Sequence, residues 1–447
     1  MAVNGDILVL AERLIDKARA AGADAADVVV FESASLSAAW RLGKLEDVER
    51  SEAQDLGLRV FSGQRQAIVS STDLTGAALD PLVERAVAMA KAAPEDPYCG
   101  LADPALYARS LLELDLDDGI TPSAEELAER AAKAEDAALA VSGVTNSGGA
   151  DASFGRAGIA LVTSAGFAER YQGSSHSVSC SVLAGQGTRM ERDYDFSSAR
   201  HLADLDDAAA IGRNAGERAV RRLNPRKIAS QSVPVIYDPR ASGGLLGHFA
   251  GAISGSAIAR GTSFLKDRMG KTVFADGVEI IDEPHRVRGL RSKPFDGEGV
   301  ANRRMTFVED GRLTSWLLDS ATARQLGLAT TGHAARGAGS PPSPSTTNFY
   351  MAPGPLPPEA LMADIRSGLY ITELIGMGVN SVTGDYSRGA SGFWIENGAL
   401  AYPVSEITVA GNLKDMFRQL TPANDLVFRY GTNAPTVRVE GMTIAGT

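Results

Sequence analysis

The stretch from Val233 to Leu265, VPVIYDPRASGGLLGHFAGAISGSAIARGTSFL, shows how the second half of this chain is built. A short apolar run leads through Asp238 and a proline into a segment rich in glycine and alanine that carries His248. The pattern predicts a strand, a turn and then a helix over residues 240–258. A helix in this place suits a zinc hydrolase, which needs at least three protein ligands and a general base.

The residues around His248 do not supply those ligands. Phe249 follows it directly, and Ala252 and Ile253 stand four and five positions beyond it. Residues 239–266 contain no acidic side chain. A lone histidine on a face of small and apolar residues is most often packed against the protein interior. We therefore interpret His248 as a packed residue at a degenerate metal-helix position. The sequence predicts no metal ligand and no catalytic residue in this chain.

The first half of the chain, residues 1–226, predicts an α+β domain in which helices flank an antiparallel sheet, with a central segment at about 120–226. Helical patterns occur over residues 6–21, 79–93, 123–140 and 205–223. Strand-like stretches follow the first helix at residues 28–31, 35–41, 44–52 and 56–60, with hairpin turns expected at Gly43 and Gly63. From residue 143 to residue 195 the pattern predicts further short strands separated by glycine, serine and asparagine.

Residues 232–447 predict a second, β-rich domain, either a barrel or a sandwich, because strand patterns punctuated by glycine dominate it. Helical patterns are confined to residues 240–258, 319–326 and 358–366. Residues 334–346 (AARGAGSPPSPST) are rich in glycine, proline and serine and predict a mobile surface loop.

The composition restricts the partners of the chain, which has 447 residues and a formal net charge of -11. A negative surface repels phosphates, so we expect no nucleic-acid partner. The cysteines, Cys99 and Cys180, are too few for a disulfide framework and indicate a reducing compartment. The sequence contains neither a signal-peptide pattern nor an apolar run long enough for a membrane span, so we expect a cytoplasmic protein without membrane contact.

The segment GDYSRG (residues 384–389) sets four polar side chains between glycines, which let another backbone approach closely. The four are Asp385, Tyr386, Ser387 and Arg388. Such a set can hydrogen-bond the main chain of an extended peptide. The alternative is a tight hairpin whose aspartate and arginine pair with each other. His333, flanked by small residues in TTGHAARG, is a further peptide-contacting candidate, for which a structural role and a substrate-positioning role in a cleft are both open.

Longer segments of the second half carry a family resemblance. They are GLLGHFAGAISG (244–255), WLLDSATARQLGL (316–328), TGHA (331–334), VTGDYSRGASGFWIENG (382–398) and YPVSEITVAGNLKDM (402–416). With them the chain resembles the TldD/PmbA family, also described as modulator-of-gyrase proteins, and more closely its PmbA (TldE) branch. The TldD branch carries HExxxH and a late cysteine as metal ligands, and this chain has neither.

The resemblance implies the non-metal subunit of a two-subunit metallopeptidase. A TldD-like partner would hold the zinc, this chain would hold no cofactor, and the heterodimer would enclose a cavity that cleaves unfolded or leader peptides. This chain would supply cavity wall and peptide-binding strand edges. We expect pairing to bury the apolar strands around residues 393–395 and 404–409.

Two other functions are open from the sequence. The first is a non-enzymatic homodimer that binds unfolded polypeptides or modulates a toxin–antitoxin or gyrase partner. The second is a stand-alone hydrolase whose chemistry no motif reveals. Whether the chain is itself an enzyme depends on which of these three functions is correct. A paralogue with HExxxH and a late cysteine in the same genome would favour the two-subunit peptidase.

Overall fold

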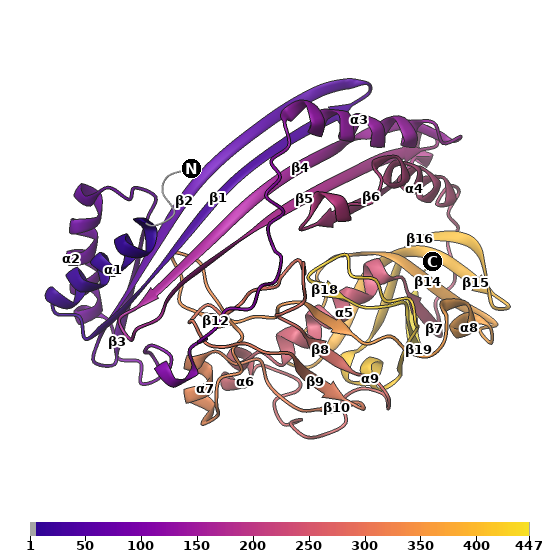
Figure 1. Cartoon of the computed structure of the whole chain (residues 1–447). Helices are drawn as coiled ribbons and strands as arrows, with labels where there is room; N and C mark the ends of the chain where they lie inside the picture. The colour runs from indigo at the N-terminus through magenta and orange to yellow at the C-terminus, as the bar shows by residue number, and fades with distance from the viewer. Residues whose placement is uncertain (1–5, 447) are drawn as a thin grey trace.

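The computed structural model describes residues 6–446, and Figure 1 shows a long arched sheet above a rounder, β-rich part. The elements of the first part are α1 (Asp6–Ala20), β1 (Ala25–Arg41), β2 (Lys44–Ser62), β3 (Arg65–Ser71), α2 (Gly76–Ala92), the 3-10 turn η1 (Pro104–Leu106), α3 (Ala124–Leu139), β4 (Val144–Thr163), β5 (Ala168–Ala184), η2 (Gly187–Arg189), β6 (Glu191–Ala199), η3 (Leu202–Asp204) and α4 (Ala208–Arg221).

One antiparallel sheet with the strand order β3-β2-β1-β4-β5-β6 organises this part. The predicted turns at Gly43 and Gly63 are confirmed, with φ of 74° and 56° in the left-handed region. The prediction of many short strands was wrong, because β1, β2, β4 and β5 each run without a break for 17 to 20 residues. The middle sections of these strands are polar because the sheet there is open to solvent on one face or both. They interrupt the apolar pattern of the sequence but not the strand itself.

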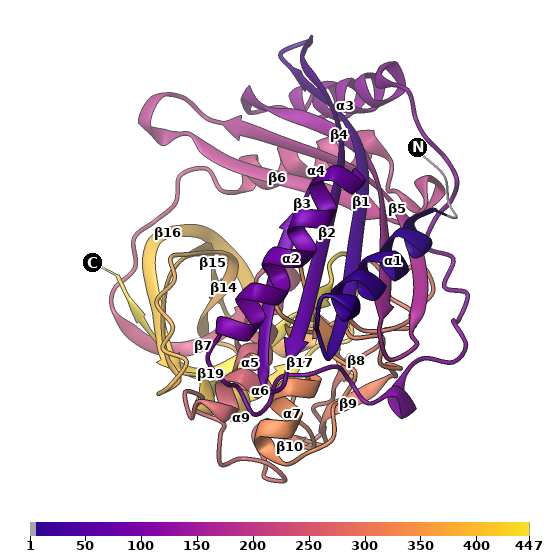
Figure 2. The ribbon, with the colours of Figure 1, turned by 90° about the vertical axis from the view of Figure 1, so that its left-hand side faces the viewer.

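Helices cover the two ends of the sheet, as Figures 1 and 2 show. At one end α1 and α2 bury Val28, Val30 and Leu58 of the sheet in a common apolar core. At the other end α3 and α4 pack on Ala152 and Cys180. The first half is therefore an α+β unit with an antiparallel sheet and flanking helices, as predicted.

The second part contains more elements, most of them short. They are β7 (Gln231–Tyr237), α5 (Pro239–Ala252), α6 (Gly255–Ala259), β8 (Ile280–Asp282), β9 (Met305–Glu309), β10 (Arg312–Leu313), α7 (Ser320–Leu326), β11 (Ala334–Ala335), β12 (Ser343–Pro344), β13 (Phe349–Met351), α8 (Pro358–Met362), β14 (Ser367–Ile375), β15 (Asp385–Glu396), β16 (Ala399–Asn412), α9 (Leu413–Arg418), β17 (Leu420–Pro422), β18 (Thr432–Asn433) and β19 (Val437–Ala445). The helix expected over 240–258 is interrupted between α5 and α6, and α9 was not predicted.

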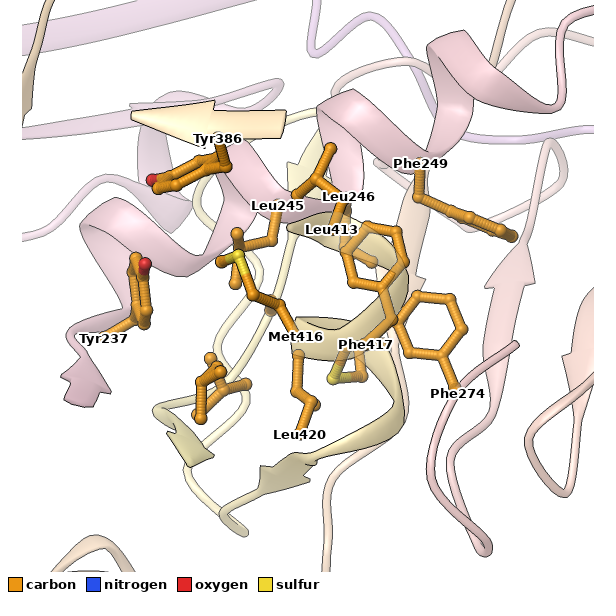
Figure 3. Close-up of a cluster of buried hydrophobic side chains, with 14 of the residues drawn as sticks. Tyr237, Leu245, Leu246, Phe249, Phe274, Tyr386, Leu413, Met416, Phe417 and Leu420 are labelled. Atoms are coloured by element: carbon orange, nitrogen blue, oxygen red, sulfur yellow. The ribbon is translucent and has the colours of Figure 1, made fainter. Parts of the chain in front are cut away.

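A closed barrel is the centre of this part. Its strands follow the order β16-β15-β14-β7-β19, and β19 pairs back onto β16. The sequence-based choice between barrel and sandwich is thereby decided in favour of the barrel. The apolar core beside it includes Tyr237, Leu246, Phe249, Phe274 and Phe417, drawn in Figure 3.

The strands that were expected to form a subunit interface are already buried inside the chain. Phe393, Trp394 and Ile395 are 9%, 5% and 0% exposed. Val404 and Val409 are 1% and 0% exposed. That expectation was wrong, because closure of the barrel brings both strands into the core of this chain, and a partner must use other residues.

The loop at residues 334–346 lies at the surface, as predicted, with residues 337, 339–341 and 343 exposed, and it is tied to the rest of the chain by several contacts. Its ends pair as β11 and β12. The backbone of Ala338 lies so close to Gly57 in β2 that a Cβ there would be 2.1 Å from the Ala338 oxygen. The side chain of Arg336 is 1% exposed and binds Asp27 of the first half of the chain. Glycine and proline here allow a close approach to the sheet.

Crossing a lipid bilayer would require a longer and more apolar helix than any found between residues 6 and 446.

Candidate functional site

Helix α5 begins where the sequence predicted and presents one face to the core. The Asp238 side chain accepts a hydrogen bond from the Arg240 amide at 2.9 Å, and Pro239 occupies the first turn, where no amide donor is needed. Leu246 and Phe249 are completely buried. His248 lies at the edge of this face and is half-buried.

The surroundings of His248 do not fit a zinc ion. Its ring meets Tyr386 edge to face, with the ring centres 6.0 Å apart. Burial, and then the positive charge of Arg388, lower the pKa of His248. Four and five positions further on, Ala252 and Ile253 are 2% and 0% exposed and offer only aliphatic groups. Within residues 6–446 no group of three or more His, Cys, Asp or Glu side chains could hold a metal ion.

The GDYSRG segment begins strand β15, and its charged residues do not pair with each other. Asp385 accepts hydrogen bonds from the Thr383 hydroxyl at 2.6 Å and from the Asn412 amide at 3.0 Å, which lower its pKa. Arg388 Nε donates to the carbonyl of Ile375 at 3.3 Å. The alternative of an Asp–Arg-paired tight hairpin is therefore wrong.

Main-chain groups on both sides of this segment are already in use. Residues 385–390 pair with β16, and on the other side Ser387 donates its amide to the Gly378 carbonyl at 2.7 Å. The Asp385 carbonyl accepts from Asn380 at 2.8 Å. An added peptide strand has no place here. A peptide could be contacted only through the exposed side chains of Asp385 and Ser387 and the half-exposed Arg388.

Tyr386 points the other way, into the protein. Figure 3 shows its hydroxyl and that of Tyr237 directed into the same region of the core. The Tyr237 hydroxyl donates to the Met442 sulfur at 3.3 Å, whereas the Tyr386 hydroxyl has no hydrogen-bond partner among the described residues. Burial raises the pKa of both phenols. Tyr386 is 2% exposed, so it anchors the segment and presents no surface to a peptide.

His333 lies in a separate buried network. Its Nδ1 is 2.9 Å from the Thr331 carbonyl, and its Nε2 is 3.2 Å from Asp282 Oδ2. The same aspartate accepts from the Thr347 amide at 2.7 Å. His333 is 0% exposed. The structure thus brings His248 together with Tyr386 and Arg388, and it places His333 where only internal contacts are possible.

A buried ionic network between the two parts of the chain was missed by the sequence analysis. Asp27 in β1 binds Arg59 in β2 and Arg336 in the β11–β12 loop. Burial raises the pKa of Asp27, but the two guanidinium groups outweigh it and hold that pKa below its usual value. Nearby, burial and then Asp296 raise the pKa of Glu298 to about 7. The sequence signal is a charge inside an apolar strand pattern, as in LGLRVF around Arg59.

Three family models match the chain in succession. They describe PmbA/TldA metallopeptidase domain 1 at residues 26–90, the central domain at 117–223 and the C-terminal domain at 230–446.

Individual proteins extend this likeness over almost the whole chain. The chain is 40% identical to metalloprotease PmbA of Escherichia coli O157:H7 over 95% of its own length and 92% of that protein. Its identity to a metalloprotease TldD homolog of Buchnera aphidicola subsp. Acyrthosiphon pisum is 25%, over 59% of this chain and 58% of that one.

Solved structures share the fold. A candidate modulator of DNA gyrase from Bacteroides thetaiotaomicron superposes with a TM-score of 0.91 at 27% identity, over 100% of both chains. TldE from Thermococcus kodakarensis superposes with a TM-score of 0.88 over 98% of this chain and 100% of that one. At 20% identity the second likeness concerns the fold alone.

Proposed function

The chain belongs to the PmbA/TldD metallopeptidase family, and from this premise we propose that it is the cytoplasmic, non-metal subunit of a two-subunit peptidase for unfolded or leader peptides. A TldD-like partner would carry the zinc and perform the hydrolysis. This chain would close the shared cavity and contribute no catalytic residue.

Helix α5 is the observation that carries this proposal. It stands directly after β7 at the edge of the barrel, where a metal helix would be expected, yet its only potential ligand is His248. The residues at the other two HExxxH positions, Phe249 and Ile253, are both 0% exposed in the core. Restoring a second histidine and a base here would require rebuilding that core, which supports hydrolysis by another chain.

The surface beside this helix suits contact with a peptide or a partner. Asp385, Ser387 and Arg388 present polar groups there. The loop that folds back on them exposes Met377 by 92% and Val382 by 52%. Exposed apolar side chains next to hydrogen-bonding groups are typical of binding surfaces. We assign peptide contact to the three polar side chains and partner contact to the apolar loop.

The test is co-expression of this chain with a TldD-like protein that carries HExxxH. We expect co-elution in size-exclusion chromatography, about one zinc per heterodimer by elemental analysis, and cleavage of an unfolded peptide only by the complex. A chain that alone binds stoichiometric metal and loses activity with a chelator would overturn the proposal. Separate elution of the two chains, with homodimers that bind unfolded polypeptide and leave it intact, would establish the non-enzymatic alternative.

A further inference from the structure

Two neighbouring cavities lie beneath the arched sheet, between the two parts of the chain. Their volumes are about 200 and 250 Å³. Both are lined by Ile159 and Tyr171 of the sheet and by Lys293 of the second part. Together they have the size of a pocket for a small organic ligand. None of the sequence-predicted site residues lines either of them.

Basic side chains dominate the lining. Arg200, Arg291, Lys293 and Arg336 line the two cavities, against Asp296 as the acidic residue. In a chain with a net charge of -11, this local excess of positive charge is unexpected. It concentrates where the first and second parts of the chain meet.

Most of these cations lack a carboxylate partner. Arg200 donates only to backbone carbonyls, those of Ser174, Gly289 and Leu290. Lys293 donates to the Ala334 carbonyl at 3.0 Å. Neither of them, nor Arg291, forms an ion pair with any described residue. Burial lowers the pKa of Lys293, and the negative charges of Asp296 and then Asp282 offset part of that effect from beyond ion-pair distance.

The nearby carboxylates accept their hydrogen bonds from other groups. Asp296 Oδ1 accepts from the amides of Glu298 and Val300, and Oδ2 accepts from that of Ala334 at 3.0 Å. Asp27 is held between two arginines. Arg336 uses one nitrogen for that contact, while its Nε and Nη2 are buried without an acceptor among the described residues. Hydrogen-bond donors are thus in excess at this place.

Apolar residues complete the lining. The sheet contributes Val29, Phe31 and Leu161 to the smaller cavity, and Phe295 faces them from the second part. Tyr171 meets Phe295 edge to face at 5.2 Å between ring centres. A ligand here meets aromatic and branched aliphatic groups as well as ammonium and guanidinium groups.

We propose that these cavities bind an organic carboxylate that carries an apolar side group, with Lys293 as the principal cationic contact. The carboxylate would sit against Lys293 and the guanidinium groups, and its apolar group would lie between Phe31, Leu161 and Phe295. A free small acid and the C-terminal residue of a peptide share this chemistry. The site lies within one chain and is independent of the function proposed above.

Isothermal titration calorimetry of the full chain, without a partner, tests the proposal. N-acetylphenylalanine is expected to bind. Its uncharged amide should bind at least roughly tenfold more weakly, because hydrogen bonds to a charged group are stronger than those to a neutral one. A pentapeptide ending in phenylalanine, with a free or an amidated C-terminus, separates the two sources. If the pentapeptide with a free C-terminus binds and N-acetylphenylalanine does not, the ligand is the end of a peptide. If both of these acids bind, a small molecule suffices.

Two variants test the assigned contact. Lys293→Met keeps the length of the side chain and removes its charge, so it should bind N-acetylphenylalanine at least roughly tenfold more weakly while folding normally. Arg291→Ala, at an exposed side chain, should weaken binding without any risk to the fold. Lys266→Met, at an exposed lysine outside both cavities, serves as the matched control and should bind like the wild type.

Three results would overturn the proposal. The first is equal affinity for acid and amide. The second is unchanged affinity in both the Lys293 and Arg291 variants. The third is no binding of any probe with a Kd below about 10 mM.

Discussion

The Arg336 guanidinium and the Asp27 carboxylate join the two halves of the chain through a contact of 2.6 Å between Nη1 and Oδ1. Both side chains are almost completely buried, at 1% and 2% exposure. Because Asp27 also binds Arg59, the carboxylate compensates two buried positive charges. Its loss should therefore cost more than the loss of either arginine.

Asp27→Ala is expected to lower the free energy of unfolding by about 3–5 kcal/mol, because it removes the carboxylate that both buried guanidinium groups bind. Arg336→Ala, which leaves the Asp27–Arg59 pair in place, should cost less, about 2–3 kcal/mol. Urea unfolding measures both. Arg50→Ala removes an exposed pair with Glu52 and should change stability by less than about 1 kcal/mol. The reverse order of the two buried variants would contradict this account.

Local signals in the sequence predicted what is local in the structure. Asp238 and Pro239 begin α5 as expected, Gly43 and Gly63 form turns, and the β-rich half is a barrel. The contact between Asp27 and Arg336 spans 309 positions, and no periodicity in the sequence encodes such a distance.

In the candidate site, too, the sequence predicted some features, and others depend on the fold. The pairing of His248 with Tyr386 depends on the crossing of α5 and β15, which only the closed barrel fixes. The identity of the GDYSRG residues could be read from the sequence. Their directions, with Tyr386 inward and Asp385 outward, follow from strand alternation once the strand is known to start at Asp385.

Glu298 makes stability depend on pH. Burial raises its folded-state pKa from 4.5 to about 7. Protonated Glu298 therefore favours the folded state, and this contribution is complete below pH 4.5 and lost as the pH rises through about 7. Between about pH 5 and about pH 8 the wild type should lose on the order of 2–3 kcal/mol of unfolding free energy relative to Glu298→Gln.

Urea unfolding at several pH values provides this comparison. Glu309→Gln, at an exposed position in β9, is the matched control and should follow the wild type. Parallel pH profiles of the wild type and Glu298→Gln would refute the assignment.

The two thiols should differ in reactivity. Burial, with a smaller effect of Glu135, raises the pKa of Cys180 to about 12, and its side chain is 1% exposed. Cys99 is only partly buried. With a chromogenic disulfide reagent at about pH 8, native protein should show one slowly reacting thiol and denatured protein two. Cys99→Ser should abolish the native reaction, and a reacting thiol in that variant would show that Cys180 is accessible.

His248→Ala tests the interpretation of His248 as a packed residue. Loss of its edge-to-face contact with Tyr386 should lower the free energy of unfolding by about 1 kcal/mol. Phe249→Ala, at the neighbouring fully buried position, should cost about 3–5 kcal/mol. In a reconstituted heterodimer the His248 variant should keep peptide cleavage, per folded complex, within a few-fold of the wild type. A collapse of turnover at unchanged stability would show that His248 acts on the substrate.

Arg388→Ala tests the peptide-contacting role of the GDYSRG segment. Among the described residues its side chain donates one hydrogen bond, to the Ile375 carbonyl, so the variant should fold normally and still pair with the metal subunit. If Arg388 binds the peptide, cleavage by the partner's zinc should fall by roughly tenfold or more, through a higher KM, because a charge-assisted hydrogen bond is lost. Arg366→Ala, an exposed arginine beside the opposite end of β14, should cleave like the wild type. Equal cleavage by both variants, in complexes that co-elute, would remove Arg388 from the peptide-binding surface and leave the cavity wall to other residues.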